Sequence, residues 1–125
     1  NLTGGEPTLK IDLLLGIISH VTSRNRYSHL CCNGSLLSKH LDRLIDAGLC
    51  SLEMGLDSAD REEHDSNRVK GSYSKIEDLT KRALSKGIPV ILNTVITKHK
   101  IRNFDMIALA KLARQLSRLA EANPR

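Results

Sequence analysis

The sequence predicts an α/β fold built on a parallel sheet, and three observations support this. Short apolar segments of strand length alternate with longer segments whose apolar residues recur at helical spacing. Glycine, proline or asparagine stands between most neighbouring segments, as turns require. The resulting alternation of strands and helices is typical of βαβ units, which join parallel strands through right-handed crossovers.

Size and composition favour one globular domain or a piece of one. The chain has 125 residues, of which 40% are hydrophobic, 26% charged and only 2% aromatic, without tryptophan. Leu, Ile, Val and Ala must therefore form the core. The formal net charge is +5, but Lys and Arg are spread along the chain and no aromatic residues interleave with them. This pattern argues against nucleic-acid binding.

No segment predicts insertion into a membrane. The longest apolar runs, residues 13–15 and 90–92, are far too short to span a bilayer. The N-terminus has neither the basic region nor the cleavage site of a signal peptide. We therefore expect a cytoplasmic location and no membrane partner.

The three cysteines predict neither disulfides nor a metal site. Their number is odd, and adjacent cysteines on a strand point to opposite faces, so Cys31 and Cys32 cannot both face one site. Cys50 lies far from both in sequence, so the spacing does not suit a metal either. We interpret all three as small buried hydrophobic residues.

The chain is organised around residues 2–7, Leu-Thr-Gly-Gly-Glu-Pro, at the end of a first predicted strand. Gly4 and Gly5 permit positive φ and close approach of a ligand, and Pro7 leads into a helix. Glu6 can accept hydrogen bonds from an ammonium group, while backbone amides nearby can meet an anion. This combination suits a zwitterion; a tight strand-to-helix turn with a solvated glutamate is the alternative interpretation.

Residues 11–21 predict an amphipathic helix, and residues 27–32 predict a strand that ends at Asn33-Gly34. The apolar residues expected on the buried face of this helix are Leu14, Ile17, Ile18 and Val21.

The next helix is capped by Ser35 or Ser38 and stopped by Gly48. Residues 49–56 then predict another strand, followed by Asp57. The stripe of this helix consists of Leu37, Leu41, Leu44 and Ile45.

Residues 58–71 are dense in charge and predict a solvated loop or a short helix with local ion pairs. Ser74 and Glu77 then form a capping box at the start of a helix that Gly87 terminates. The buried face of this helix consists of Ile76, Leu79, Ala83 and Leu84.

Residues 90–96 predict an almost wholly apolar strand, which implies burial on both faces. A last helix starts at Asn103 or Asp105, and Pro124 closes the chain. The apolar face of this helix consists of Met106, Leu109, Ala113, Leu116 and Ala120.

Distinctive residues follow the strands at their carboxyl ends, where parallel sheets bind ligands. They are Gly4, Gly5, Glu6, Asn33, Gly34, Gly55, Asp57, Asn93 and Thr94. We therefore predict a binding site at this edge of the sheet.

Four segments in order resemble the middle of a radical SAM (S-adenosylmethionine) enzyme. They are Thr3-Gly4-Gly5-Glu6-Pro7, Cys32-Asn33-Gly34 with Leu36-Leu37, Leu56-Asp57 with His64-Asp65 and Arg68, and Leu92-Asn93-Thr94-Val95. The resemblance extends from Leu2 to about Asn103. It implies an incomplete (β/α) barrel of parallel strands with outer helices, similar to part of a TIM barrel. It also implies that residues 1–125 are a single partial core domain, truncated at the N-terminal cluster-binding part and at the C-terminus.

The resemblance also implies roles for individual residues. Gly4, Gly5 and Glu6 hold the amino group of S-adenosylmethionine, in agreement with the zwitterion argument. The strand ending at Gly55 lies along the ribose and methionine, and Arg68 pairs with the methionine carboxylate. Asn93 lies beneath the adenosyl group or the substrate. The implied cofactor-binding set is Gly4, Gly5, Glu6, Asn33, Gly55, Asp57, Arg68 and Asn93, with no catalytic or metal-binding residue assigned.

The chain departs from the family pattern in two places. The family binds a [4Fe-4S] cluster through a CxxxCxxC motif upstream of the Gly-Gly-Glu turn, and this sequence contains no such motif. We expect truncation to explain this. Gly55 stands where many relatives carry serine or another polar residue, so we expect only backbone approach to the cofactor there.

The resemblance implies an enzyme that cleaves S-adenosylmethionine reductively to a 5′-deoxyadenosyl radical, which abstracts hydrogen from a substrate. The implied partners are a small-molecule or peptide substrate and a reductant protein such as flavodoxin or ferredoxin. We expect the isolated chain to be inactive. The alternative is an α/β phosphate- or nucleotide-binding module, in which Glu6 would repel the ligand. A cluster-less structural or regulatory relative is a third hypothesis.

The five histidines give no sign of acid-base or metal chemistry, because no pair has the i, i+4 spacing of a metal-binding helix. Only His64 lies near the predicted site, and we expect it to be a surface residue.

Overall fold

The computed structural model describes residues 1–102 and 105–122 and contains one parallel sheet. Its strands are β1 (His29–Cys32), β2 (Ser51–Gly55) and β3 (Val90–Asn93), in the order β1-β2-β3. The helices, with two short 3-10 turns, are η1 (Pro7–Lys10), α1 (Ile11–Ser23), η2 (Leu37–Lys39), α2 (Leu41–Asp46), α3 (Arg61–Asn67), α4 (Ser72–Ser85), α5 (Lys98–Arg102) and α6 (Asp105–Glu121).

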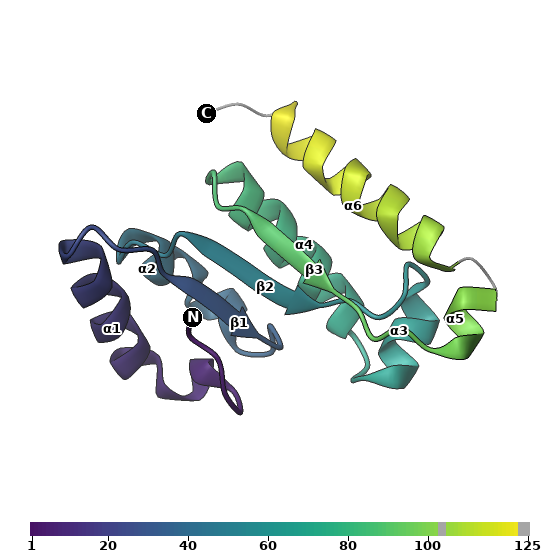
Figure 1. Ribbon diagram of the computed structural model, residues 1–125, viewed down its shortest axis with the longest axis horizontal. Coiled ribbons are helices and arrows are strands. Elements are labelled where there is room, and N and C mark those ends of the chain that lie inside the picture. Colours follow the sequence, from purple (N-terminus) through teal and green to yellow (C-terminus); the bar gives the residue numbers. More distant parts are fainter. Residues whose placement is uncertain (103–104, 123–125) are drawn as a thin grey trace.

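Helices connect the strands, and α2 and α4 cover one face of the sheet (Figure 1). In the same view α1 flanks β1, and α6 lies beside α4, which it contacts. Both strand pairs are parallel, which confirms the α/β class and the parallel sheet. An open sheet with helices on one side is consistent with part of a (β/α) barrel.

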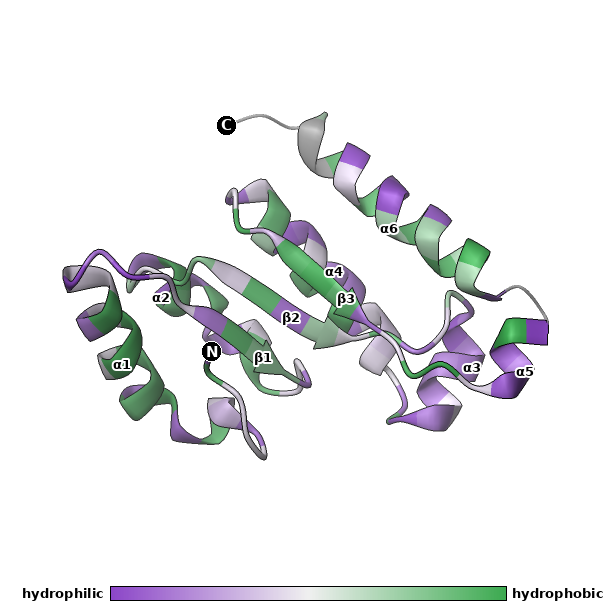
Figure 2. Cartoon of the chain, in the orientation of Figure 1, coloured by the Kyte–Doolittle hydropathy of each residue, from purple (hydrophilic) through white to green (hydrophobic). Residues whose placement is uncertain are grey.

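The core lies between the sheet and this helical layer. Alternate strand residues point toward the helices, so Leu30, Leu52 and Met54 are fully buried. Figure 2 shows the same alternation of hydrophobic and hydrophilic residues along β2. The helical residues buried against these strands include Leu14, Ile18, Leu37, Leu41, Leu44, Ile76, Leu79 and Ala83. Most of the predicted core is thereby confirmed.

The predicted helix between the first two strands of the sheet is divided into η2 and α2. Neither Ser35 nor Ser38 caps it, because neither helix has a side-chain cap. The amide of Ser35 instead donates to Asn33 Oδ1 over 2.8 Å, which keeps this segment in a turn. The stop at Gly48 is confirmed: its φ is +103°, and an added Cβ would lie 2.7 Å from Thr22 Cγ2.

Helix α4 begins two residues before the predicted capping box. Its first turn is capped by Asp65, whose carboxylate accepts hydrogen bonds from the amides of Gly71 at 2.6 Å and Tyr73 at 2.8 Å. Ser74 makes no such cap, since its hydroxyl lies against the Arg61 guanidinium. The predicted capping box is therefore wrong, because the helix starts earlier and a side chain from the preceding helix caps the amides at that start.

Strand β3 is not buried on both faces as predicted. It pairs with β2 on one side and lies at an edge of the described sheet, where Ile91 is 51% exposed. The segment after it forms the short helix α5, which the sequence pattern did not predict.

Helix α6 agrees with the predicted start at Asp105. Leu116 is buried and Leu109 packs on the core, whereas Ala113 is exposed. The predictions for Asn103, Pro124 and the Ala120 side chain lie outside the described residues. Over the part of the chain that the structure describes, no helix is long and apolar enough to cross a membrane.

Candidate functional site

The diglycine turn lies at the carboxyl end of the sheet. Leu2 forms an isolated parallel bridge with Leu30: its amide donates to the His29 carbonyl, and its carbonyl accepts from the Cys31 amide. This pairing is the end of the first predicted strand. Gly4 has a φ of +142°, and no atom lies within 4 Å of a Cβ built on Gly4 or Gly5. The turn therefore presents bare backbone that a ligand can approach.

Glu6 fastens this turn to the end of β1. Its Oε1 accepts hydrogen bonds from the amide of Thr8, at 3.1 Å, and from the Thr8 hydroxyl. Its Oε2 accepts from the amide of Asn33 at 2.9 Å. The carboxylate thus holds Asn33 next to the diglycine turn, and two predicted parts of the site come together.

The end of β2 forms a second group around Gly55. A Cβ built on Gly55 would lie only 2.6 Å from Arg68 Nη1, so the guanidinium occupies the volume that a side chain would fill. The Arg68 side chain therefore lies over Gly55, where we expected only backbone to face the cofactor. The Arg68 side chain, which follows α3, takes the place of a side chain on the strand.

Asp57 forms an ion pair with the Arg68 guanidinium. Its Oδ2 accepts from Arg68 Nε at 2.6 Å, and its Oδ1 accepts from the Val95 amide at 3.1 Å. Burial alone would raise the pKa of the Asp57 carboxyl, but these hydrogen bonds and the charges of Arg68 and Lys100 outweigh it and lower that pKa. The carboxylate is therefore ionised and engaged within the chain.

Two buried residues outside the predicted cofactor-binding set complete this group. His64 is fully buried rather than exposed, and its Nδ1 accepts from the Asp57 amide at 3.1 Å. Burial, followed by the charge of Arg68, lowers the pKa of His64, so it is neutral. The ammonium of Lys100 donates to the Asp57 and Val95 carbonyls.

The sequence contained a signal for only one of them. Asp60 and Glu63 have capping-box spacing, and Asp60 caps α3. This spacing would have supported the helix on which His64 lies, whereas Lys100 lies on an unpredicted one.

Asn93 belongs to the face of the sheet opposite α2 and α4. It pairs with Gly55 in the sheet, and its Nδ2 donates to Glu53 Oε1 at 2.8 Å. Glu53 Oε2 also contacts His29 Nε2 at 3.1 Å. Hydrogen bonds from Asn93 and then His29 lower the pKa of Glu53. Glu53 was missed because one carboxylate within an apolar strand carries no motif.

A cavity of about 240 Å³ is lined by one residue of each of the two groups. Asn33 and Arg68 both line it, and Lys70 and Lys75 add positive charge to its wall. The remaining lining residues are Ser35, Val69 and Ser72. Positive side chains and hydroxyls can bind a carboxylate or a phosphate.

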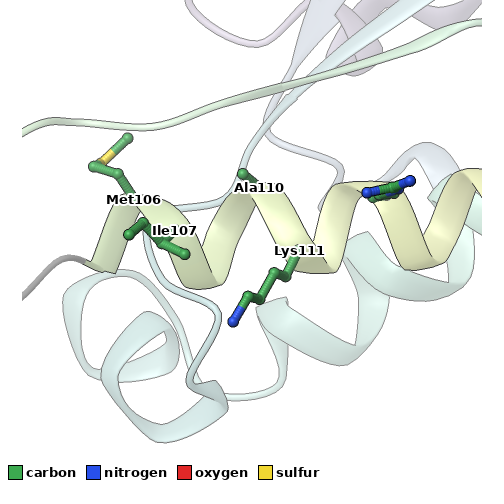
Figure 3. A pocket seen from close by; sticks show the side chains of 5 residues that line it. Met106, Ile107, Ala110 and Lys111 are labelled. Carbon is green, nitrogen blue, oxygen red and sulfur yellow. The ribbon is translucent and has the colours of Figure 1, made fainter.

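Another cavity of about 240 Å³ is lined by Glu6 together with Thr3 and Pro7. Two further cavities lie along α6. Figure 3 shows one of about 340 Å³, lined by Met106, Ile107 and Ala110 together with Lys111 and Arg114. None of its lining residues belongs to the predicted cofactor-binding set.

The described residues do not suit an iron-sulfur cluster. Nowhere among them do three His, Cys, Asp or Glu side chains form a group that could hold a metal ion. Burial raises the pKa of Cys32 to about 12, and burial followed by the charge of Glu53 raises the pKa of Cys31. Both thiols therefore resist becoming the thiolates that such a cluster requires. The interpretation as buried small residues holds for Cys32, whereas Cys31 and Cys50 are only half-buried.

Comparison with known proteins agrees with this geometry. The sequence model of the Radical SAM superfamily matches residues 1–113. The molybdenum cofactor biosynthesis protein moc-5 of Caenorhabditis elegans is 32% identical over 114 residues, covering 88% of this chain and 19% of the relative. A GTP 3′,8-cyclase of Chlorobaculum tepidum is 31% identical over 115 residues, which is 90% of this chain and 34% of that protein.

A PqqA peptide cyclase of Bradyrhizobium diazoefficiens is 27% identical over 127 residues, covering 98% of this chain and 33% of the relative. The chain thus spans between about a fifth and a third of these relatives, from 19% to 34%. The match of the superfamily model covers nearly the whole sequence, and we conclude that this chain belongs to the radical SAM superfamily.

Proposed function

We propose that this chain is the S-adenosylmethionine-cradling segment of a radical SAM enzyme. The superfamily uses S-adenosylmethionine and a [4Fe-4S] cluster. The observation that carries the proposal is the open diglycine turn on the same edge of the sheet as the Arg68 guanidinium. These two features offer acceptors for an ammonium group and donors for a carboxylate, the two charged ends of an amino acid.

The ammonium end of the cofactor is assigned to the diglycine turn. Among the described residues, the carbonyls of Gly4 and Gly5 accept no backbone hydrogen bond. They can accept from an ammonium, and the Glu6 carboxylate adds negative charge behind them. Because Thr8 and Asn33 already bond Glu6, its main role is to hold the turn and supply charge.

The carboxylate end is assigned to Arg68. Only its Nε is used by Asp57, so Nη1 and Nη2 remain for a ligand. A guanidinium binds a carboxylate through two parallel hydrogen bonds, which fixes orientation as well as charge. The strand that ends at Gly55 is proposed to lie along the ribose and methionine. Asn93, which pairs with Gly55 in the sheet, is proposed to lie beneath the adenosyl group or the substrate.

When both cofactors are bound, they supply reductive cleavage of the sulfonium and hydrogen abstraction from a substrate. The residues described here bind and orient the sulfonium nucleoside. Since none of them suits the cluster, we propose that the cluster ligands lie outside this chain and that the chain alone is inactive. Reconstitution with iron and sulfide followed by iron and sulfur analysis tests this, and a stoichiometric cluster would contradict it.

The names of the relatives suggest the kinds of substrate. One group is named for cyclisation of GTP and another for cyclisation of a peptide. We propose a small-molecule or peptide substrate for the intact enzyme and a reductant protein, such as flavodoxin or ferredoxin, as the electron source.

Calorimetric titration with S-adenosylmethionine tests the central proposal. Arg68→Ala should weaken binding about tenfold or more, the scale of a charge-assisted contact. Arg26→Ala is the matched control, because Arg26 is an exposed arginine that precedes β1, at the opposite end of the strand from the site, and should not change affinity. Equal affinity of the wild-type chain and the Arg68 variant would refute the assignment.

Glu6→Gln separates this proposal from the phosphate-binding alternative. Loss of the negative charge should weaken S-adenosylmethionine binding, whereas phosphate binding should hold or improve if the site is built for an anion. Because Glu6 also supports the turn, melting temperatures of both proteins are needed to separate a loss of charge from a loss of folding.

A further inference from the structure

We propose that Lys100 is a positioning residue that, through Asp57, holds the Arg68 guanidinium over Gly55. This inference rests on the proposed function, because it concerns the carboxylate end of the same site. Lys100 lies on α5, which the sequence pattern did not predict, and its ammonium contacts Asp57, a residue of the predicted cofactor-binding set.

The first step concerns the burial of Lys100. Its exposed fraction is 4%, which is unusual for lysine. Its ammonium donates to the carbonyls of Asp57 and Val95, the latter at 3.1 Å. Thr97 Oγ1 accepts from the Lys100 amide at 3.3 Å and fixes the start of α5. Burial of a cation is costly unless its hydrogen bonds are satisfied, so this geometry is strongly determined.

The second step concerns Asp57, whose amide, carbonyl and two carboxylate oxygens all form hydrogen bonds. Its amide donates to His64 Nδ1, and its carbonyl accepts from Lys100 and, at 3.4 Å, from Thr94 Oγ1. Its two carboxylate oxygens accept from Val95 and Arg68. Asp57 therefore has little freedom to move and little capacity left for a ligand. Its role is to fix Arg68 rather than to touch the cofactor.

The third step concerns charge. Lys100 and Arg68 carry two positive charges against the single negative charge of Asp57, so the group has a net charge of about +1 at neutral pH. Arg68 pairs directly with the Asp57 carboxylate, whereas Lys100 donates only to carbonyls, so the excess positive charge comes from Lys100. Such a group selects an anion, and it matches the carboxylate of an amino acid. Without Lys100, the charges of Asp57 and Arg68 would cancel, and the segment after β2 would lose a hydrogen bond to α5.

Two ligands that differ only in this carboxylate test the proposal. Lys100→Met should lower the affinity for S-adenosylmethionine about tenfold but leave the affinity for decarboxylated S-adenosylmethionine unchanged. Lys98→Met is the control, because Lys98 is exposed on the same helix and should affect neither ligand. In the Arg68→Ala background, Lys100→Met should have no further effect. An equal loss for both ligands, or a loss that persists without Arg68, would overturn the proposal.

A second readout needs no ligand. The Arg68 Nε–H, held by Asp57, should give a slowly exchanging NMR signal that Lys100→Met broadens or removes while the amide spectrum stays folded. An unchanged signal would also overturn the proposal. If the methionine variant does not fold, Lys100→Gln carries the same expectation with a smaller loss of hydrogen bonding. Failure of the wild-type chain to bind S-adenosylmethionine would instead refute the proposed function, and the NMR result would still decide the role of Lys100.

Discussion

Substitution of Gly55 by alanine should displace the Arg68 guanidinium without unfolding the protein. A Cβ at this position would lie 2.6 Å from Nη1 and 2.7 Å from Cζ of Arg68, which is closer than real Cβ contacts. The atoms in conflict are the far end of a flexible side chain, so Arg68 moves and the strand stays. Gly55 has no positive φ, so alanine fits the backbone and stability should change by no more than about 1 kcal/mol.

The effect on binding should be much larger than the effect on stability. A hydrogen bond to a charged group contributes about 1.5–3 kcal/mol, which corresponds to roughly 10-fold to 150-fold in the dissociation constant. Titration calorimetry with S-adenosylmethionine should show this loss for Gly55→Ala and a similar loss for Arg68→Ala. The double variant should resemble Arg68→Ala alone, because both changes remove the same contact.

Gly16→Ala provides the matched control for the glycine substitution. Gly16 lies inside α1, and no atom lies within 4 Å of its built Cβ, so alanine should stabilise the helix by about 0.5–1 kcal/mol without changing affinity. Unchanged binding by the Gly55 variant, or additive losses in the double variant, would refute the idea that the guanidinium over Gly55 contacts the ligand.

Three further predictions concern stability. The pKa of His64 is lower in the folded than in the unfolded chain, so the unfolded chain binds a proton at higher pH and the free energy of unfolding should fall as pH drops below about 6.5. Urea unfolding at pH 7 and pH 5 should show this decline in the wild type and a smaller decline in His64→Gln. Leu52→Ala should cost about 2–5 kcal/mol in urea unfolding because Leu52 is fully buried, whereas Leu13→Ala, at a position 64% exposed, should cost little. Asp65→Ala should lower the melting temperature by removing the cap of α4, and Ser74→Ala should not; the reverse order would contradict the observed cap.

The sequence was sufficient to predict the parts of the fold that depend on local pattern. Apolar spacing located α1, α4 and the three strands, because a buried stripe requires a fixed period. The glycines at positions 34 and 48 marked turns correctly, since both have positive φ.

The wrong predictions concern features that depend on contacts between segments distant in sequence. The cap of α4 comes from Asp65, outside the helix, so the local pattern at Ser74 was misleading. Likewise, the exposure of β3 depends on which strands neighbour it, and its own apolar sequence does not determine that.

The candidate site also contains features that the sequence indicates and features that it does not. The diglycine turn stood out because glycine permits close approach of the backbone, whereas Arg68 was singled out only by the resemblance to the family. That the Arg68 side chain fills the volume beside Gly55 could not be predicted, because these residues meet only in three dimensions. Lys100 carries no sequence signal of its own, and the burial of His64 could not be predicted, since both features depend on packing and on bonds to Asp57.

The bond from the Asn33 amide to Glu6 joins residues 27 positions apart and encloses α1 in a closed loop. The bridge between Leu2 and Leu30 fastens the residues before the diglycine turn to the same strand. Changes in the length or surface of the enclosed helix should therefore leave the bend in place. The position of this bend is therefore fixed by contacts with β1 rather than by the outer helix.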